Sequence, residues 1–196
     1  MSDQSDQQGR RERAGGGEAK ALRRKPHPLV LLFTGHGKGK TTAALGVTMR
    51  AWGRGWSICW LQFIKPTTAN FGETRAAARM GIEMIPLGDG FTWQSPDLEK
   101  SKALAHECWA TARSKLESAQ YDLVVLDEIT YPITYGWLDV AEVIETIKRR
   151  PANVHVILTG RDAAPELQEF ADLVTDMGEV KHPFHQGIRA QAGIEF

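Results

Sequence analysis

The sequence predicts one α/β domain with a mainly parallel central sheet and helices on both faces of that sheet. Three observations support this prediction. From Leu29 onward, short and nearly continuous apolar runs alternate with longer amphipathic stretches, which is the pattern of strands buried on both faces and of the helices that connect them. Of the 196 residues, 42% are hydrophobic and 24% are charged, as in ordinary globular domains. No repeat of a solenoid type is visible.

Apolar runs and capping or turn residues place the individual elements. The expected strands are residues 29–34, 57–63, 82–86, 123–126, 154–159 and 173–176. The expected helices are residues 40–54, 72–80, 96–119, 140–149 and 164–170. The folded domain is therefore expected to comprise residues 28–196.

Residues 1–27 are expected to form a flexible arm, because they are polar and lack periodic apolar positions. The first 28 residues carry seven Lys or Arg and four Asp or Glu, a net charge of +3, so the remainder carries −3 and the whole chain is neutral. A neutral total gives no indication of a nucleic-acid partner.

Cysteine and hydropathy patterns point to the cytoplasm. Cys59 and Cys108 are too few for a disulfide scaffold or a Cys-rich metal site, and both are expected to be buried. No apolar run is long enough to span a bilayer, and residues 1–27 lack the apolar core of a signal peptide. We therefore expect no membrane partner.

Aromatic and imidazole side chains have simple structural interpretations. Four tryptophans lie within expected helices or strands and are expected to be core residues rather than a platform for nucleic-acid bases. They are Trp52, Trp56, Trp60 and Trp109. His182 and His185 have a spacing found in metal sites, but no cysteine or third histidine is nearby, so a solvated or packed pair is favoured.

The most specific motif is FTGHGKGKTT at residues 33–42, between the first expected strand and the first expected helix. Glycines allow several backbone N–H groups to point inward, the helix N-terminus adds partial positive charge, and Lys40 adds a full one. The motif therefore predicts a site for the phosphates of ATP. The residues assigned to the nucleotide are Gly35, His36, Gly37, Lys38, Gly39, Lys40, Thr41 and Thr42. The usual motif has glycine where Thr34 stands, so its strict form fails at the first position.

Metal ligands are expected from two places. A hydroxyl beside Lys40, from Thr41 or Thr42, is placed to bind the Mg²⁺ that accompanies ATP. The second motif, YDLVVLDE at residues 121–128, is an apolar strand that ends in Asp127 and Glu128. In a parallel sheet these carboxylates face the same crevice as the phosphate loop and can meet the metal directly or through water. The two motifs predict an ATP site and leave the reaction open.

At this point the sequence resembles one family, the ATP:corrinoid adenosyltransferases of the cob(I)yrinic acid a,c-diamide adenosyltransferase type. The segments that carry the resemblance are FTGHGKGKTTAA (33–44), QFIK (62–65), GDGFTW (88–93), VVLDEITY (124–131), LTGR (158–161) and VKH (180–182). They occur in the family's order and span nearly everything after the arm. The family's own loop is a shortened form that accounts for Thr34, and His36 occupies its asparagine position.

The resemblance implies a P-loop NTPase-like (RecA-like) three-layer sandwich. It implies transfer of the 5′-deoxyadenosyl group of ATP to the cobalt of a reduced corrinoid, with release of triphosphate, in adenosylcobalamin biosynthesis and salvage. The implied ligands are ATP, Mg²⁺ or Mn²⁺ and the corrinoid. Because cob(I) is the nucleophile, the protein needs no nucleophilic side chain. Lys40 and Lys38, with the metal, would stabilise the departing triphosphate.

The resemblance also assigns roles outside the two motifs. Phe91 and Trp93 would displace the lower axial ligand of the corrinoid, and Arg161 would contact the triphosphate. A homodimer, an arm that folds over the active site and an electron-donating reductase such as a flavodoxin are implied as well. Two alternatives are a P-loop NTPase or small-molecule kinase, which product analysis distinguishes, and a non-catalytic nucleotide-binding module, which Asp127 and Glu128 disfavour.

Overall fold

A computed structural model of the chain describes residues 27–66, 68, 71–88 and 98–195. These residues form a six-stranded sheet with the order β3-β2-β4-β5-β1-β6, and every pairing in it is parallel. The strands are β1 (Val30–Thr34), β2 (Ile58–Pro66), β3 (Glu83–Gly88), β4 (Leu123–Asp127), β5 (His155–Thr159) and β6 (Leu173–Asp176). The helices are α1 (Lys40–Trp52), α2 (Gly72–Met80), α3 (Leu98–Glu117), α4 (Thr130–Thr134), α5 (Val140–Lys148), α6 (Pro165–Phe170) and the 3₁₀ helix η1 (Pro183–Gln186).

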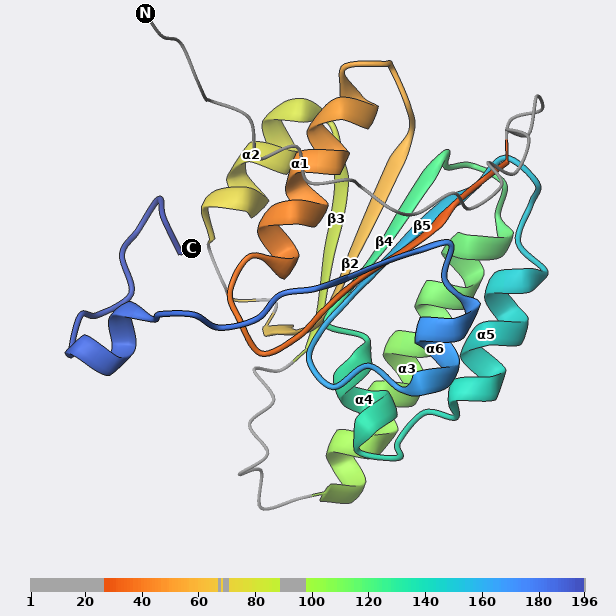
Figure 1. Ribbon diagram of the computed structural model, residues 1–196. Helices are drawn as coiled ribbons and strands as arrows, with labels where there is room; N and C mark the ends of the chain where they lie inside the picture. The colour runs from red at the N-terminus through yellow and green to blue at the C-terminus, as the bar shows by residue number, and fades with distance from the viewer. Residues whose placement is uncertain (1–26, 67, 69–70, 89–97, 196) are drawn as a thin grey trace, which may run out of the picture.

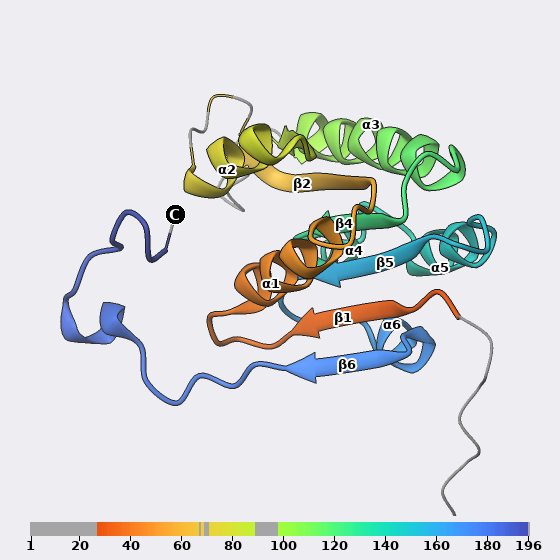
Figure 2. The same ribbon diagram turned by 90° about the horizontal axis from the view of Figure 1, so that it is seen from above.

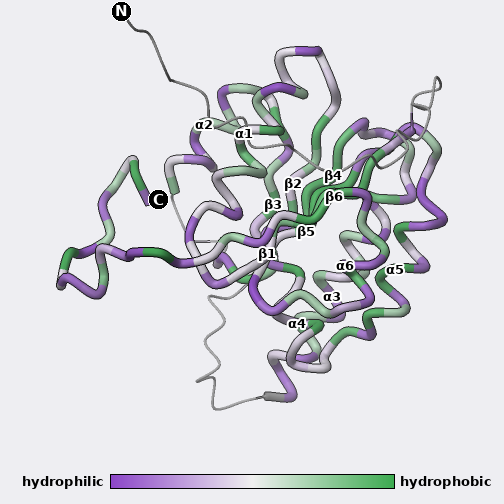
Figure 3. Tube along the Cα trace, in the orientation of Figure 1, coloured by the Kyte–Doolittle hydropathy of each residue, from purple (hydrophilic) through white to green (hydrophobic). Residues whose placement is uncertain are grey.

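The helices form two layers on opposite faces of the sheet (Figure 1). Helices α1 and α2 cover one face, and α3, α5 and α6 cover the other. A separate hydrophobic core lies on each face of the sheet. In β4, Leu123 and Val125 pack in the core on the side of α1 and α2, whereas Val124 and Leu126 pack in the core on the side of α3, α5 and α6. Alternate side chains of one apolar strand thus belong to different cores, which is why the strand reads as a continuous apolar run. Figure 3 shows these hydrophobic strands at the centre of the molecule. The predicted three-layer α/β fold is confirmed.

The carboxyl ends of all six strands lie at the same edge of the sheet, because every strand runs in the same direction. Chain segments that follow β1, β2, β4 and β5 therefore meet at this edge, which we call the carboxyl edge; the opposite end is the amino edge. In open α/β sheets ligands bind beyond the carboxyl ends of the strands. The topology thus positions the two sequence motifs side by side.

The C-terminal segment after β6 leaves the sheet and crosses in front of the carboxyl edge (Figure 2). Its last described residues, Gly193, Ile194 and Glu195, return to the side of α1 and α2, where they line a cavity with Thr41. None of the helices in the described part of the chain is long and apolar enough to cross a membrane.

Two of the four tryptophan predictions are wrong. Trp60 and Trp109 are buried in the core, whereas Trp52 and Trp56 keep 47% and 36% of their surface exposed. Trp52 is the last residue of α1, and its indole N–H donates to the Met80 carbonyl oxygen at 2.8 Å. Trp56 precedes β2 and stacks on His155, with ring centroids 4.9 Å apart. Both lie at the amino edge, beyond the point where the layers cover the sheet.

The predicted elements all form, with shifts at their ends, but α4 and the short 3₁₀ helix η1 were not predicted. Helix α4 contains a proline at its third position and has no side-chain cap. Because helix signals in a sequence depend on caps and on several turns of periodic apolar residues, a five-residue helix leaves too little pattern to find. Cys59 and Cys108 are both buried, as expected.

Candidate nucleotide site

The phosphate loop connects β1 to α1 at the carboxyl edge and is pinned to the chain that follows β6. Gly35 has a φ of 97°, a left-handed conformation, and a Cβ placed on it would lie 2.2 Å from Asp176 Oδ1. A Cβ on Gly37 would lie 2.7 Å from the Met177 carbonyl oxygen, which accepts a hydrogen bond from the Gly37 N–H at 2.7 Å. These two positions therefore require glycine, for backbone conformation and for close approach.

Lys40 lies over the centre of the loop. It is the first residue of α1, and its Nζ donates to the carbonyl oxygens of Gly35 at 2.6 Å and Gly37 at 2.7 Å. An ammonium group has three donors, so one remains for a ligand. Burial, and then the charge of Arg161, lower the pKa of Lys40 from its ordinary value. The loop thus holds one half-buried cation at the place where the sequence predicts phosphate.

Asp127 is the fully buried end of β4. Its Oδ1 accepts hydrogen bonds from the hydroxyls of Thr41 at 3.1 Å and Thr159 at 2.7 Å. Its Oδ2 is buried and has no hydrogen-bond partner among the described residues. A buried carboxylate oxygen without a partner is unfavourable, and oxygen atoms of carboxylates and hydroxyls are the ligands that Mg²⁺ prefers. Asp127 and Thr41 therefore fit the predicted metal. Both Thr41 and Thr42 line the adjoining cavity, but Thr41 is the one whose hydroxyl contacts Asp127.

Glu128 follows Asp127 but faces a different environment. Its backbone is left-handed, with a φ of 66°, and its N–H donates to the Thr159 hydroxyl at 2.9 Å. Burial and the neighbouring charge of Asp127 raise the pKa of Glu128 to about 7, against the opposing influence of Lys65, Lys40 and Arg161. Left-handed backbone at a non-glycine residue is a strained conformation that is concentrated at functional sites. Glu128 thus directs its carboxylate into the cavity.

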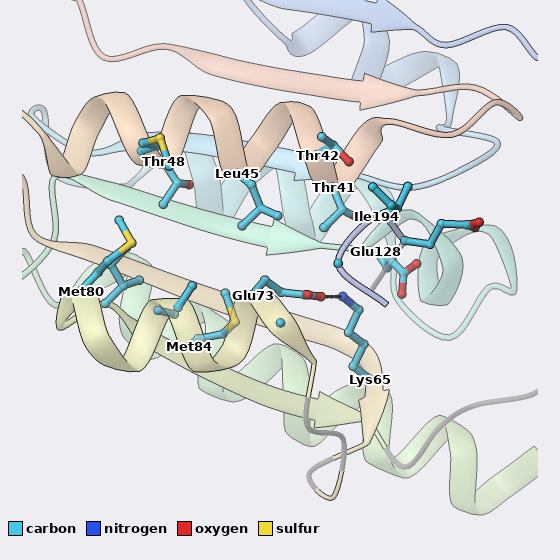
Figure 4. A pocket seen from close by; sticks show the side chains of 17 residues that line it. Thr41, Thr42, Leu45, Thr48, Lys65, Glu73, Met80, Met84, Glu128 and Ile194 are labelled. Atoms are coloured by element: carbon cyan, nitrogen blue, oxygen red, sulfur yellow. Dashed lines mark hydrogen bonds and ion pairs between the residues drawn. The ribbon is translucent and has the colours of Figure 1, made fainter. Parts of the chain in front are cut away.

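The cavity has a volume of about 520 Å³ and lies between α1 and α2 (Figure 4). It is lined by Thr41, Thr42, Leu45, Thr48, Met49, Lys65, Gly72, Glu73, Ala76, Ala77, Met80, Ile82, Met84, Glu128, Gly193, Ile194 and Glu195. At its polar end, Lys65 Nζ and Glu73 Oε1 form an ion pair at 2.6 Å, with 19% and 11% of the side chains exposed. The Lys65 ammonium also lies 4.9 Å from the centroid of the Phe71 ring.

Sequence reasoning assigned no role to Lys65 or Glu73. Lys65 belongs to the QFIK segment, but a lysine at a strand end has no specific spacing to a partner. Glu73 is an acid in the first turn of a helix, where acids are favoured in any helix. The sequence therefore contains no local signal for the pair, which forms because α2 runs back against β2, so that the end of the strand lies beside the first turn of the helix.

The remaining predicted residues lie around the loop, and several contact carboxylates of the protein. His36 Nε2 is 3.4 Å from Asp162 Oδ1. Lys38 forms an ion pair with Glu195. Arg161 is exposed after β5, close enough to influence the pKa values of Lys40 and Glu128. Phe91 and Trp93 lie outside the described residues, as does the arm except for its last residue, so their roles stay predictions.

The two histidines of the C-terminal segment have local partners. His182 Nδ1 accepts from the Phe184 N–H at 3.0 Å and caps η1, and His185 Nε2 lies 2.8 Å from Glu179 Oε1. Among the described residues, no group of three or more His, Cys, Asp or Glu side chains could hold a metal ion. The two rings lie 5.9 Å apart and His185 is exposed, which agrees with the solvated or packed pair favoured from the sequence.

Together the parallel sheet, the glycine-rich loop with Lys40, and Asp127 beside Thr41 define a protein with a P-loop NTPase-like (RecA-like) fold. A solved structure with the same fold is the flagellar accessory protein FlaH from Methanocaldococcus jannaschii. It aligns with a TM-score of 0.53 and 13% identity over 77% of this chain and 71% of that chain. At this identity the likeness concerns the fold alone.

Closer relatives identify the family. The family model described as ATP:corrinoid adenosyltransferase BtuR/CobO/CobP matches residues 26–196. The corrinoid adenosyltransferase of Escherichia coli strain K12 is 40% identical over 168 residues, which are 86% of this chain and 85% of the relative. That of Pseudomonas aeruginosa is 39% identical over 188 residues, 95% of this chain and 92% of the relative. The chain belongs to the ATP:corrinoid adenosyltransferase family.

Proposed function

We propose that the protein transfers the 5′-deoxyadenosyl group of ATP to the cobalt of a reduced corrinoid and releases triphosphate, in adenosylcobalamin biosynthesis and salvage. Family membership supports adenosyl transfer to a corrinoid. The structural observation that carries the ATP assignment is Lys40 at the centre of the phosphate loop, beside the buried pair of Asp127 and Thr41. This arrangement is suited to a polyphosphate with its metal.

In the reaction, the electron pair of cob(I) forms the Co–C5′ bond while the C5′–O5′ bond breaks, and the electrons of that bond leave with triphosphate. The protein therefore stabilises a leaving group and supplies no nucleophile. Lys40 retains a free donor, and the first turn of α1 offers backbone N–H groups and partial positive charge. These groups stabilise the charge that develops on the leaving oxygen.

No described cysteine serves as a nucleophile in this scheme. Cys59 and Cys108 lie in the core, and burial raises the pKa of the Cys59 thiol to about 12. A protonated and inaccessible thiol is unreactive. The requirement that the corrinoid brings its own nucleophile is therefore consistent with the chemistry of the site.

Asp127 and Thr41 would hold Mg²⁺ or Mn²⁺, and the metal, when bound, neutralises charge on the phosphates. Asp127 supplies the Oδ2 atom that has no partner among the described residues. Thr41 supplies a hydroxyl that already contacts the same carboxylate. Glu128, which faces the cavity, would act through water or through the ligand rather than as the main metal ligand.

Lys38 would join the site once ATP is present. Its ammonium is paired with Glu195, and a triphosphate, with its greater charge, would displace that carboxylate. His36 and Arg161 flank the loop and would contact the phosphates from outside it. Phe91 and Trp93, by the family resemblance, would exclude the lower axial ligand of the corrinoid.

Three further proposals concern the protein in the cell. The enzyme would be a cytoplasmic homodimer, and an electron-donating reductase such as a flavodoxin would supply the cob(I) state. The N-terminal arm, with its excess of basic residues, would help to cover a site that holds a polyanion. These proposals rest on the family resemblance and on the charge distribution of the sequence.

A product assay tests the proposed function. The protein is incubated with ATP, Mg²⁺ and chemically reduced cobalamin, and the products are followed by absorbance and by anion-exchange chromatography. We expect the light-sensitive spectrum of an adenosyl–cobalt bond together with free triphosphate. Formation of ADP and phosphate without the adenosyl–cobalt spectrum would instead identify an NTPase or a kinase.

A further inference from the structure

Thr159 is the last residue of β5 and lies beside Asp127, the last residue of β4. Parallel pairing sets Val125 opposite Ile157, and both pack in the core on the side of α1 and α2. Two residues farther along each strand, Asp127 and Thr159 are therefore neighbours that face the same side of the sheet. This is the side on which Thr41 lies, in the first turn of α1.

The Thr159 hydroxyl makes two hydrogen bonds, both with residues at the end of β4. Its Oγ1 accepts from the Glu128 N–H at 2.9 Å and donates to Asp127 Oδ1 at 2.7 Å. An ionised carboxylate only accepts, and a hydroxyl has one proton, so that proton belongs to the bond with Asp127. Thr159 is fully buried. Solvent therefore does not compete for either bond.

The residue that follows fixes the position of this hydroxyl. Gly160 has a φ of 142°, a conformation that favours glycine. A Cβ placed on it would overlap the Thr130 hydroxyl and lie 3.0 Å from Thr130 Cβ. Thr130 is the first residue of α4, which follows β4. The end of β5 thus packs closely against the chain that follows Asp127, and the Thr159 side chain has little freedom to leave its partners.

At Asp127, two hydroxyls hold the same oxygen atom. Oδ1 accepts from Thr159 and, at 3.1 Å, from Thr41, whereas Oδ2 has no partner among the described residues. Rotation of the carboxylate about its Cβ–Cγ bond would break both hydrogen bonds. The two hydroxyls differ in what else they do, since Thr41 is itself a proposed metal ligand and Thr159 only holds the carboxylate. Thr159 is therefore the group that keeps Oδ2 free for a ligand.

At Glu128, the same hydroxyl holds the backbone. The Glu128 N–H belongs to the peptide that joins it to Asp127, so its bond to Thr159 fixes the orientation of that peptide. The left-handed φ of 66° at Glu128 is strained and persists only where the surrounding structure holds it. This backbone directs the Glu128 side chain into the cavity beside the phosphate loop (Figure 4). One hydroxyl thus sets the directions of two consecutive carboxylates.

We propose that Thr159 is a positioning residue for adenosyl transfer, an inference that rests on the proposed function. Its hydroxyl keeps Asp127 Oδ2 free for the metal that accompanies ATP and keeps Glu128 directed into the cavity. Because its proton is already donated to Asp127, Thr159 acts through these carboxylates rather than on the substrates. Within the LTGR segment, residues 158–161, sequence reasoning assigned a role to Arg161 alone.

Removal of the hydroxyl tests this role. Thr159→Val keeps the shape of the side chain, and Thr159→Ser keeps the hydroxyl. ATP binding is measured by calorimetry at increasing Mg²⁺ concentrations. In Thr159→Val, the Mg²⁺ concentration that gives half of the full gain in ATP affinity should rise by about 10-fold, because the metal ligand is no longer held. The Kd for ATP without metal should stay within about twofold of wild type, and Thr159→Ser should restore the wild-type Mg²⁺ titration.

Thr146→Val is the matched control. Thr146 is another fully buried threonine, but it lies on α5 on the opposite face of the sheet. Its substitution should leave the Mg²⁺ titration unchanged. Because Thr159→Val leaves the Glu128 N–H without its acceptor, urea denaturation without metal checks that each variant is folded. If Thr159→Val does not fold, Thr159→Cys replaces it, since a thiol is a weaker donor and acceptor and should shift the titration in the same direction.

Two results would overturn the role of Thr159. One is a folded Thr159→Val or Thr159→Cys variant that requires no more Mg²⁺ than wild type. The other is an equal loss of ATP affinity with and without Mg²⁺, which would show that the hydroxyl supports the loop rather than Asp127.

The proposed function fails separately, if wild-type protein forms no adenosyl–cobalt in the product assay. The Mg²⁺ titration needs no turnover. A shifted titration in Thr159→Val would therefore still assign the positioning of Asp127 to Thr159, whatever reaction the bound ATP undergoes.

Discussion

Polar groups at the two edges of the sheet differ in whether they have hydrogen-bond partners within the protein. At the amino edge, Glu83 accepts hydrogen bonds from Lys115 and from the Tyr121 hydroxyl. Arg150, near the start of β5, donates to three backbone carbonyl oxygens. At the carboxyl edge, by contrast, Asp127 Oδ2 is buried without a partner among the described residues.

The pKa shifts show the same contrast. Hydrogen bonds from Lys115 and Tyr121 lower the pKa of Glu83, whereas burial raises that of Glu128 to about 7. At the amino edge, hydrogen bonds from other protein groups satisfy the charged side chains. At the carboxyl edge, buried polar groups lack part of their hydrogen bonds. Such groups are unfavourable for stability and are concentrated at ligand sites. The comparison indicates that the carboxyl edge is built for a ligand and the amino edge for folding.

The largest expected effect is that of Lys40→Ala. Loss of the ammonium group that lies over the loop should lower kcat/KM for ATP by about 100-fold or more, because a charge that stabilises the leaving group is removed. Lys115→Ala, which removes a lysine at the amino edge, should leave kcat/KM within about twofold of wild type. Similar losses of kcat/KM in both variants would show that the two edges do not differ in function.

Asp127→Asn is expected to abolish the effect of the metal on ATP binding. The amide keeps one oxygen for Thr41 and Thr159 but replaces the partnerless Oδ2 with a nitrogen that cannot bind Mg²⁺. Calorimetry with and without Mg²⁺ should show a metal-dependent gain in ATP affinity for wild type and none for the variant. A gain of the same size in the variant would place the metal on other residues.

Glu73→Gln should reduce sugar selectivity. Glu73 lines the cavity beside the phosphate loop and keeps acceptor capacity after its bond from Lys65. If Glu73 accepts from the ribose of ATP, wild type should prefer ATP over 2′-deoxyATP by roughly 10-fold in kcat/KM, and the variant should lose most of that preference. Glu145→Gln is the control, because it removes the carboxylate of an exposed pair with Lys148 on α5. Equal losses with both nucleotides would show that Glu73 only holds Lys65.

Glu128 gives a pH test of stability in the absence of metal and nucleotide. Its pKa in the folded state, about 7, is above its ordinary value of 4.5, so the folded protein binds an extra proton between these values. This contribution, roughly 3 kcal/mol, is fully present below pH 4.5 and is lost as the pH rises through 7. Wild type should lose more free energy of unfolding than Glu128→Gln between pH 5 and pH 8, measured by urea denaturation.

The smallest effect, with opposite sign, is expected for Glu83. Because its pKa is lowered in the folded state, its contribution is present above the unfolded pKa and is lost as the pH falls. Glu83 is largely exposed, so solvent weakens the effect. Urea denaturation between pH 5 and pH 3 should show a slightly smaller loss of stability for Glu83→Gln than for wild type. A larger loss would contradict the pairing with Lys115 and Tyr121.

Much of the fold could be predicted because its signals are local. Strands buried on both faces are continuous apolar runs, and helix ends such as Asp139, whose side chain accepts from the Ala141 N–H, are marked by single residues. The phosphate loop is equally local, since glycines and Lys40 lie within a few residues of one another. The exposed positions of Trp52 and Trp56 could not be predicted, because they depend on where the helix layers end.

The sequence by itself determined the α/β class, the phosphate loop and the acidic strand end, because each is encoded by neighbouring residues. Only the tertiary structure decided that Asp127 contacts Thr41 while Glu128 faces a cavity. It also decided that Lys65, Glu73 and Thr48 line that cavity together. The physical reason is that these contacts join side chains from different strands and helices, whose separation is set by sheet order and by packing rather than by spacing along the chain.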